Sequence, residues 1–277
     1  MSLNKIPLAG VIGSPIAHSK SPQLHKHWLK TYGMQGFYIP MDIPSADLRG
    51  VLLTLPKMGF VGVNITIPHK EAVLEIADLI TDRATLIGAA NTLIFHKDGK
   101  IHADNTDGYG FLENLKTGAP QWVSQAGPAV VLGAGGAARA VVASLLDAGV
   151  PEILISNRTR VRADKLAADF GQRLKVVDWV QAGNVLEEAV LTVNTTSLGM
   201  IGKPELRVPL GGLRKGTVVT DLVYAPLQTN FLIEAAAQGC VTVDGLGMLL
   251  HQAVPAFERW FGQRPVVDSA TRAAVLR

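Results

Sequence analysis

Short runs of apolar, often β-branched residues alternate along almost the whole chain with segments in which apolar residues recur at helical spacing. In the first half, the apolar runs predict strands at residues 8–12, 37–39, 62–65 and 92–96. The segments between them predict helices at residues 23–32, 45–55 and 71–79. Regular alternation of strands and helices is typical of an α/β fold.

A second series of strands begins at residue 129, where an apolar run leads into the glycine-rich segment 133–136 and then into a helix. Further apolar runs predict strands at residues 152–155, 175–177, 191–193, 217–221 and 241–243. This rhythm indicates a doubly wound parallel sheet of the Rossmann type. We therefore predict an α/β protein with two α/β lobes, of which the second is Rossmann-type.

The loop at residues 117–127 has glycine and proline at its edges and looks like the seam between the two lobes. After Gly245 the pattern turns mostly helical, over residues 246–261 and 269–276. Periodicity alone leaves open which lobe these last helices cover.

The composition narrows the class of protein. The 277 residues are 48% hydrophobic and 18% charged, which supplies a core and argues against disorder. No uncharged apolar run reaches about 18 residues, so we predict no membrane-spanning helix. The net charge of +3, from 26 basic and 23 acidic residues, permits small anionic ligands but does not favour nucleic acid. The single cysteine, Cys240, excludes a disulfide framework and favours the reducing cytoplasm.

The histidines give no sign of a metal centre. The seven of them are scattered and form neither H-E-x-x-H nor a cluster with cysteine. We therefore predict no metal site, and a metal-dependent hydrolase is disfavoured. His25 and His27 are interpreted as residues on a helix surface.

The segment after residue 132 carries a dinucleotide-binding pattern. Gly133, Gly135 and Ala138 match G-x-G-x-x-A between a predicted strand and a predicted helix. Glycines there allow backbone N–H groups to approach a pyrophosphate, and the helix N-terminus adds a partial positive charge. Because a second strand follows about 20 residues later, we favour a dinucleotide site over a bare strand–helix turn.

The end of that second strand bears on which dinucleotide is bound. NAD sites of this type usually place Asp or Glu there to hold the ribose 2′-hydroxyl. This chain has no acidic residue at that point, and Arg158, Arg160 and Arg162 follow. Guanidinium groups bind phosphate in a bidentate manner, so we predict NADP. The alternative is a solvated basic loop.

A candidate acid/base group lies in the segment 64–71. Pro68 suits a first helical position, which would put Lys70 in the first turn of a helix that begins there. The helix dipole there disfavours a charged lysine, and a lysine tuned in this way exchanges protons near neutral pH. An ordinary exposed lysine is the alternative.

Asp107 is a second candidate. It could cap a helix that runs through Phe111 and Leu115. A carboxylate at this point could also pair with Lys70 and a substrate hydroxyl, and the two interpretations are compatible.

Ser19 and Ser21 form a third candidate. Ser21 resembles an N-cap, with Pro22 at the first helical position. Two hydroxyls at a helix N-terminus can also receive a carboxylate, although the pattern alone favours capping.

Taken in order, a set of short segments resembles the shikimate dehydrogenase family over nearly the whole chain. Each segment is modest alone, and the ordered set is specific. The segments are residues 18–22, 64–70, 88–92, 104–108, 133–137, 157–159, 194–200, 221–224 and 245–252.

The resemblance implies a substrate-binding and catalytic lobe of residues 1–106 plus 245–277, to which the last helices return, and an NADP-binding Rossmann domain of residues 107–244. It implies reversible NADPH-dependent reduction of 3-dehydroshikimate to shikimate, in the pathway to chorismate and the aromatic amino acids. A quinate/shikimate dehydrogenase with NAD or dual cofactor use is the alternative. A non-catalytic module that kept the fold is disfavoured by the presence of Lys70 and Asp107.

The resemblance also implies roles for individual residues. The catalytic pair would be Lys70 and Asp107. Substrate contacts would come from Ser19, Ser21, Thr66, Asn91, Asp107, Tyr224 and Gln252, which replaces capping as the main role of the two serines. NADP contacts would come from Asp82, Gly133, Ala134, Gly135, Gly136, Ala137, Asn157, Arg158, Thr159, Arg162, Leu222 and Gly245. We expect a cytoplasmic enzyme that acts on a small-molecule substrate. Whether it forms a homodimer is left open by the sequence.

Overall fold

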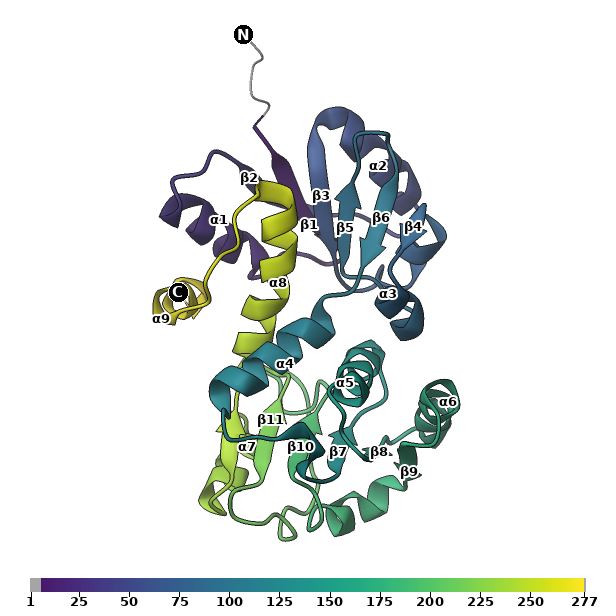
Figure 1. Cartoon of the computed structure of the whole chain (residues 1–277), viewed down its shortest axis with the longest axis vertical. Coiled ribbons are helices and arrows are strands. Elements are labelled where there is room, and N and C mark those ends of the chain that lie inside the picture. Colours follow the sequence, from purple (N-terminus) through teal and green to yellow (C-terminus); the bar gives the residue numbers. More distant parts are fainter. Residues whose placement is uncertain (1–5, 277) are drawn as a thin grey trace. The chain divides into compact units, whose positions relative to one another are not determined.

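The computed structural model describes residues 6–276, which divide into two compact units (Figure 1). Unit 1 comprises the described residues up to Thr106 and those from Gln252 onward, and unit 2 is Asp107–His251. In the part of the chain that the structure describes, no helix has the length and apolar character needed to cross a membrane.

Unit 1 is built on a six-stranded mixed sheet of order β2-β1-β3-β5-β6-β4. Strands β1, β2 and β3 are parallel, whereas β5 runs antiparallel to both β3 and β6. The parallel strands therefore end at one edge, where their following loops meet. The strands are β1 (Leu8–Gly13), β2 (Phe37–Asp42), β3 (Phe60–Ile65), β4 (Leu79–Ile80), β5 (Thr92–Phe95) and β6 (Ile101–Asp104).

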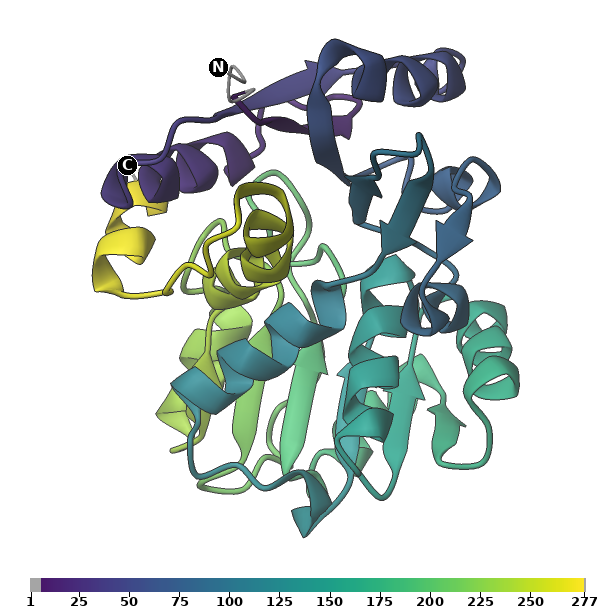
Figure 2. The same cartoon turned by 45° about the horizontal axis from the view of Figure 1, so that its top comes forward.

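The helices of unit 1 come from both ends of the chain. The contact between α1 and α9, visible in Figures 1 and 2, includes a hydrogen bond from Trp28 Nε1 to Thr271 Oγ1 at 3.4 Å. The helices are α1 (Ser21–Thr31), α2 (Leu48–Thr54), α3 (Asp82–Ile87) and α9 (Ser269–Leu276), with 3₁₀ turns η1 (Leu55–Met58) and η2 (Ala72–Glu75). Helix α8 (Leu246–Phe261) belongs to unit 1 from Gln252 onward.

The prediction of a helix at residues 71–79 is wrong. Only the short turn η2 forms, and the chain then enters β4, which pairs with β6. Asp78 binds both backbone groups of Ile101, the first residue of β6. Its N–H donates to Ile101 O at 2.9 Å, and its carboxylate accepts from Ile101 N at 2.8 Å. Pairing with a distant strand therefore overrides the local helical pattern.

Helix α8 closes over the sheet of unit 1 at Gly62. A Cβ on Gly62 would lie 2.0 Å from Trp260 Nε1 and 2.3 Å from Leu93 O. Trp260 Nε1 donates to Leu93 O at 3.2 Å, so the indole lies directly on the strand backbone. Only a residue without a side chain permits this approach.

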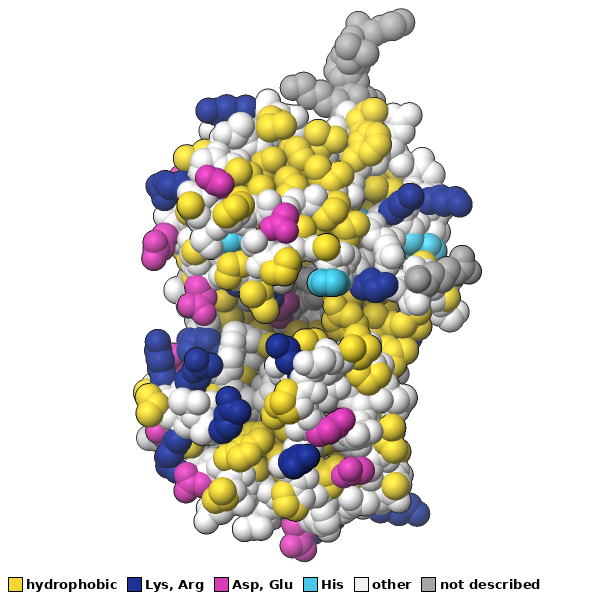
Figure 3. Space-filling model, turned by 180° about the vertical axis from the view of Figure 1, so that it is seen from behind, with side chains coloured by type: hydrophobic (Ala, Val, Ile, Leu, Met, Phe, Trp, Pro, Cys, Tyr) yellow, Lys and Arg dark blue, Asp and Glu magenta, His cyan; other side chains and the backbone are white. Residues whose placement is uncertain are grey.

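Some apolar side chains of unit 1 remain exposed. They include Phe37 and Ile39 of edge strand β2, and Figure 3 shows hydrophobic side chains gathered on the upper part of the rear face. Pro40, in the same strand, has no N–H to offer a neighbouring chain. A proline in an edge strand weakens edge-to-edge pairing.

Unit 2 is a six-stranded, wholly parallel sheet of order β12-β11-β10-β7-β8-β9. This order confirms the predicted doubly wound Rossmann-type sheet, with the strand order reversing between β7 and β10. The strands are β7 (Ala129–Leu132), β8 (Ile153–Ser156), β9 (Leu174–Val177), β10 (Leu191–Asn194), β11 (Val218–Asp221) and β12 (Val241–Val243). The helices are α4 (Asp107–Gly118), α5 (Gly136–Asp147), α6 (Arg160–Phe170) and α7 (Asn230–Ala237), with 3₁₀ turns η3 (Ser124–Ala126) and η4 (Trp179–Val185).

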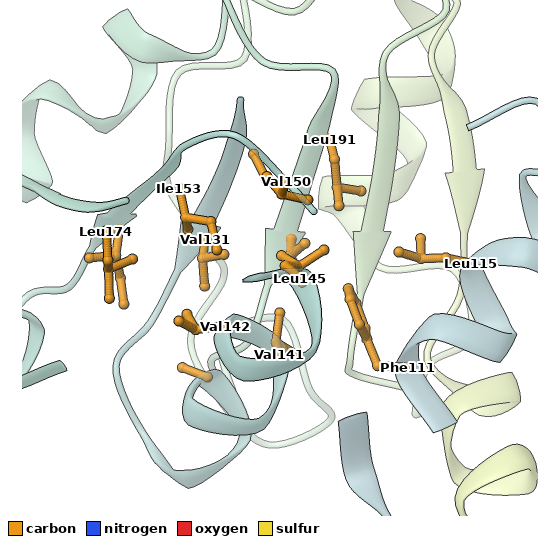
Figure 4. Packing of buried hydrophobic residues seen from close by; sticks show 14 of the residues in the cluster. Phe111, Leu115, Val131, Val141, Val142, Leu145, Val150, Ile153, Leu174 and Leu191 are labelled. Atoms are coloured by element: carbon orange, nitrogen blue, oxygen red, sulfur yellow. The ribbon is translucent and has the colours of Figure 1, made fainter. Parts of the chain in front are cut away.

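Both faces of the unit 2 sheet are covered. Val131 of β7 packs into a cluster with Leu145 of α5 and Phe111 of α4 (Figure 4). Its neighbours Val130 and Leu132 point into a second cluster on the opposite face. Because both faces are buried, β7 is apolar at every position, which explains why the sequence pattern found it.

The seam expected at residues 117–127 is wrong, because α4 precedes that loop and belongs to unit 2. It packs closely on α5, where a Cβ on Gly108 would lie 3.1 Å from Ala140 O. The second crossing falls inside α8, after His251, rather than at residue 245. The first turn of α8 is held to α4, since a Cβ on Gly247 would lie 1.8 Å from Asn114 Oδ1.

Replacing Gly62 by alanine tests the contact under Trp260. We expect Gly62→Ala to lower the free energy of unfolding by about 3 kcal/mol, because neither the indole nor the strand backbone has room to move. Gly50→Ala is the matched control: it lies in α2, and no atom of the described chain is within 4 Å of its added Cβ. The control should raise stability by roughly 0.5–1 kcal/mol. Urea denaturation of both variants measures the difference, and equal stabilities would contradict the packing.

Candidate functional site

The loops that follow β1, β2 and β3 are tied together by backbone and imidazole contacts. Ser14 N donates to Ile67 O, and Ile43 N donates to Gly13 O, both at 3.1 Å. His69, which is buried, places its Nε2 at 2.7 Å from Ile43 O. These bonds gather three loops at the carboxyl ends of parallel strands, where sites of this architecture usually lie.

The two serines lie at the start of α1. The helix begins at Ser21 itself, and the N-cap position is Lys20 without a side-chain cap bond, so the predicted N-cap role of Ser21 is wrong. Ser19 Oγ instead accepts from Ser21 N at 3.3 Å. Pro22 is therefore the second helical residue, one position later than predicted.

Lys70 lies in a turn between β3 and η2, and it is half-buried. Its predicted position in the first turn of an α-helix is wrong, so the helix-dipole argument for a neutral lysine no longer applies. Its carbonyl accepts from Ala90 N at 2.8 Å, which places the backbone of Lys70 beside that of Asn91.

Asn91 and Gln252, two predicted substrate-binding residues, are brought together although they are far apart in the sequence. Asn91 Nδ2 donates to Gln252 Oε1 at 3.1 Å. Asn91 Oδ1 accepts from Thr106 N at 2.9 Å and from Thr92 Oγ1 at 3.0 Å. These bonds fix the amide of Asn91 in one orientation. Thr66, which is half-buried, lies against the loop after β1, because a Cβ on Gly13 would be 2.5 Å from its Cγ2.

Sequence reasoning missed the polar residues behind this group. Tyr38 Oη donates to Asn64 Oδ1 at 2.7 Å, and Asn64 Nδ2 donates to Asn91 O at 3.0 Å. A hydrogen bond with Ser21 also reaches Tyr38, whose pKa is raised by burial and only partly lowered by that bond. The available signal was a lone asparagine in the otherwise apolar strand β3.

The interpretation of His25 as a residue on a helix surface is wrong. It is fully buried and stacks on Tyr38, with ring centroids 3.8 Å apart. Burial lowers the pKa of His25 to about 3, so the ring is neutral at pH 7. The preceding Leu24 and the following Trp28 are also buried, and this helical spacing placed His25 on the apolar face.

An ion pair between the exposed Arg83 and the buried carboxylate of Asp104 precedes the catalytic candidate Asp107. Arg83 Nε donates to Asp104 Oδ1 at 2.6 Å, and Thr81 Oγ1 and Asn105 N donate to the same oxygen. Burial works to raise the pKa of Asp104, but the hydrogen bonds and charge of Arg83 outweigh it and hold the pKa below its usual value. The pair therefore fixes the end of β6.

Asp107 is the first residue of α4 and is buried, so it lies one position inside the helix that it was predicted to cap. A carboxylate in a first turn is favoured by the helix dipole. Asp107 belongs to unit 2, whereas Lys70 belongs to unit 1. Asp82, predicted to contact the cofactor, is an exposed residue of unit 1 at the start of α3.

The glycine turn of unit 2 is shaped for a ligand. Gly133 has a φ of +111°, and a Cβ there would lie 2.5 Å from Thr195 Oγ1. Gly135 and Gly136, in contrast, have no atom of the described residues within 4 Å of an added Cβ. The turn is thus tight against the protein at Gly133 and open at the N-terminus of α5. Ala134 lies in this turn and Ala137 in the first turn of α5, an arrangement that suits a pyrophosphate.

The arginines beyond β8 differ in their engagement. Arg160 pairs with Asp178 and with Asp164. Arg158 and Arg162 are exposed, and neither makes an ion pair with any residue that the structure describes. Asn157 Nδ2 donates to Thr159 O at 2.8 Å, which shapes the loop that carries Arg158. These exposed guanidinium groups suit an additional phosphate.

The loop after β11 approaches the start of α8 very closely. A Cβ on Gly245 would lie 2.4 Å from Leu222 O, so only glycine is accommodated. Tyr224 is half-buried in the same loop, and burial raises its pKa. Among residues 6–276, no group of three or more His, Cys, Asp or Glu side chains could hold a metal ion.

A wholly parallel sheet with an open glycine turn and exposed arginines after its second strand defines a nicotinamide dinucleotide-dependent oxidoreductase. Family models match three parts of the chain: the shikimate dehydrogenase substrate binding domain at residues 11–93, shikimate/quinate 5-dehydrogenase at 121–205, and the shikimate 5′-dehydrogenase C-terminal domain at 245–275. A relative from Roseobacter denitrificans named shikimate dehydrogenase (NADP(+)) is 70% identical over 276 residues, 100% of each chain. This chain belongs to the shikimate dehydrogenase family.

Solved structures agree. Shikimate 5-dehydrogenase from Thermus thermophilus, in complex with NADP(H) and shikimate, is 40% identical with a TM-score of 0.87, covering 98% of both chains. Quinate dehydrogenase from Corynebacterium glutamicum, in complex with NAD, is 33% identical with a TM-score of 0.90, covering 97% of this chain and 98% of that one.

The Arg83–Asp104 pair makes the stability of unit 1 depend on pH. Because the pKa of Asp104 lies below its value in an unfolded chain, about 3.9, the pair stabilises the fold above that pH and ceases to do so as the pH falls through the lower folded value. We expect Arg83→Ala to lower Tm by roughly 2–6 °C at pH 7, and we expect the difference from wild type to shrink as the pH is lowered below about 3.9. Lys100→Ala, which breaks the exposed pair with Asp98, is the control and should change Tm little at either pH. A constant difference across this range would contradict the assignment.

Proposed function

We propose that this protein reduces 3-dehydroshikimate to shikimate with NADPH and catalyses the reverse oxidation with NADP⁺. The buried polar group around Asn91 and Gln252 carries the substrate side of the proposal, and the open turn at Gly135 carries the cofactor side. The 70% identity to a relative named shikimate dehydrogenase (NADP(+)) supports both. The direct test is NADPH absorbance with shikimate and NADP⁺, repeated with chelator, since no metal is expected to be needed.

The carboxylate of the substrate would bind at the start of α1. Ser19 and Ser21 present hydroxyls beside a helix N-terminus, an environment that favours a carboxylate. The ring hydroxyls would be bound by Thr66, Asn91 and Gln252 of unit 1 and by Tyr224 of unit 2. Amide and hydroxyl groups suit this task because each can donate and accept.

NADP would be held by backbone N–H groups of residues 133–137 and by the loop at residues 157–162. Arg158 and Arg162 would bind the 2′-phosphate, with Asn157 and Thr159 shaping the loop. Leu222 and Gly245 would border the nicotinamide, and Asp82 is a further proposed contact. When bound, the cofactor supplies the hydride chemistry.

Lys70 and Asp107 would carry the proton chemistry. As the carbonyl of 3-dehydroshikimate is reduced, negative charge develops on its oxygen. The ammonium of Lys70 would stabilise that charge and deliver the proton, and the carboxylate of Asp107 would hold the lysine and a substrate hydroxyl in place. In the reverse reaction the neutral amine of Lys70 would accept the proton from the substrate hydroxyl.

A quinate/shikimate dehydrogenase using NAD is the second candidate, favoured by the likeness to the NAD complex of quinate dehydrogenase. Exposed Arg158 and Arg162 favour NADP, since a 2′-phosphate gives them a partner. Oxidation of shikimate and of quinate, each with NADP⁺ and NAD⁺, distinguishes the two.

We propose the cytoplasm as the site of this activity, because one cysteine suits a reducing compartment. A homodimer stays a prediction. Light scattering would report about twice the 29.5 kDa of one chain if it forms.

Lys70→Ala tests the proposed acid. We expect kcat to fall on the order of a hundredfold or more, with a smaller change in KM for shikimate, because the loss affects mainly the transition state. Lys57→Ala removes an exposed lysine of η1 and should leave both constants unchanged. Near-normal turnover of Lys70→Ala would remove this residue from the role.

Arg158→Ala tests the cofactor preference. We expect the Kd for NADP⁺ to rise roughly tenfold to a hundredfold while that for NAD⁺ stays nearly the same, because only NADP⁺ has a 2′-phosphate. Lys165→Ala removes an exposed cation in the middle of α6 and serves as control. Titration of intrinsic fluorescence measures each Kd, and equal losses for both cofactors would refute the assignment.

A further inference from the structure

Asp221 is a fully buried carboxylate at the end of β11 that the proposed chemistry does not use. Three donors surround it. Asn194 Nδ2 and Val223 N donate to Oδ1, each at 2.9 Å, and Thr229 Oγ1 donates to Oδ2 at 2.7 Å. Burial raises the pKa of Asp221, and these three hydrogen bonds oppose the rise. Both oxygens of this buried carboxylate are thus hydrogen-bonded within the protein.

The first donor links Asp221 to the loop that follows β10. Asn194 Oδ1 accepts from Thr196 N at 3.0 Å and from Thr196 Oγ1 at 2.8 Å, so its amide nitrogen is turned toward Asp221. The next residue, Thr195, bonds Leu132 O through its hydroxyl at 2.8 Å. Asp221 is therefore connected through Asn194 to the loop that packs against the glycine turn.

The second donor sets the path of the chain after β11. Val223 N–H points back to Asp221, which forms a tight turn over two residues. Leu222 and Tyr224, the residues on either side of Val223, are thereby turned in fixed directions. The backbone of Leu222 is fixed by two contacts. Its N–H donates to Asn194 O at 3.0 Å, and its carbonyl packs against Gly245, which has no side chain in the way.

The third donor closes the segment at its far end. Thr229 caps α7, accepting from Leu232 N at 3.4 Å, while its hydroxyl hydrogen goes to Asp221. One carboxylate thus holds the beginning and the end of the segment 222–229 and the start of the loop after β10.

We propose that Asp221 is a positioning residue of the reaction, which aligns the nicotinamide-side contact Leu222 and the substrate contact Tyr224 through its three hydrogen bonds. The inference rests on the proposed function, which assigns those two contacts. Asp221 acts by geometry, and its charge is not required. Misplacement of reacting groups by about 1 Å can strongly lower turnover. The proposed 2′-phosphate contacts follow β8, three strands away from β11 in the sheet, so cofactor affinity should change less.

Two substitutions separate geometry from charge. In Asp221→Asn the side-chain oxygen keeps Asn194 and Val223 as donors, and the new amide N–H faces Thr229 Oγ1, which is able to accept. In Asp221→Glu the charge is kept, but the extra methylene moves the carboxylate out of register with all three donors. We therefore expect Asn to retain kcat within about fivefold and Glu to lose on the order of tenfold or more.

The experiment measures kcat with shikimate and NADP⁺, the Kd for NADPH by fluorescence, and hydrogen exchange of the peptide covering residues 222–229. Asp221→Glu should show lower kcat and faster exchange of this peptide, with the Kd for NADPH within threefold of wild type. Thr220→Val is the matched control on the same strand, since its buried Oγ1 has no partner in the described structure, and it should change none of the three. Circular dichroism melting verifies that each variant folds.

Wild-type protein without shikimate activity would refute the proposed function, whereas exchange and NADPH binding still report on Asp221. Three results would overturn the positioning role. They are an Asp221→Asn variant as impaired as Asp221→Glu, an Asp221→Glu variant as active as wild type, and a parallel loss of kcat and NADPH affinity. If Asp221→Glu does not fold, Thr229→Val replaces it, because it removes one donor with little change in shape. That variant should lower kcat and leave NADPH affinity unchanged, and an unchanged kcat would overturn the proposal.

Discussion

Polar side chains buried at the carboxyl ends of the strands must find all their hydrogen-bond partners within the protein, since water does not reach them. Asn64 meets this requirement in unit 1, and Asn194 and Asp221 meet it in unit 2. An amide donates from one end and accepts at the other, so each bond fixes the orientation of the next group. The loops after these strands are consequently held in one arrangement, and the candidate ligand-binding residues lie on those loops.

His25 shows what happens where the requirement is not met. Neither of its ring nitrogens has a hydrogen-bond partner in the described part of the chain. An unsatisfied buried nitrogen costs about 1–3 kcal/mol, and stacking on Tyr38 and packing against Trp28 offset part of that cost. The neutral ring keeps the hydroxyl of Tyr38 directed at Asn64 without placing a charge near the proposed carboxylate site.

The sequence predicted the fold most accurately where burial alone determines the pattern. The strands of unit 2 are rich in apolar residues because both faces of the sheet are covered, and each predicted run overlaps an observed strand. The prediction failed where a distant contact decides the local structure. Residues 79–80 pair with β6 instead of extending a helix, and α4 joins unit 2 because glycines at 108 and 247 let helices approach closely. A single sequence does not reveal which distant backbone fills such a gap.

The candidate site divides in the same way. Gly133 and Gly135 were predictable because the turn needs them for reasons internal to a strand–turn–helix unit, whereas Tyr38 and Asp221 act only through partners elsewhere in the chain. Three nearby arginines looked equivalent in the sequence. The fold distinguishes them, because Asp178 and Asp164 engage Arg160 and leave Arg158 and Arg162 exposed to a ligand phosphate. The charge that we propose to recognise the cofactor thus lies at the surface, where desolvation costs little. The residues that we propose to orient the substrate and the nicotinamide are held instead by buried hydrogen bonds, which water does not reach.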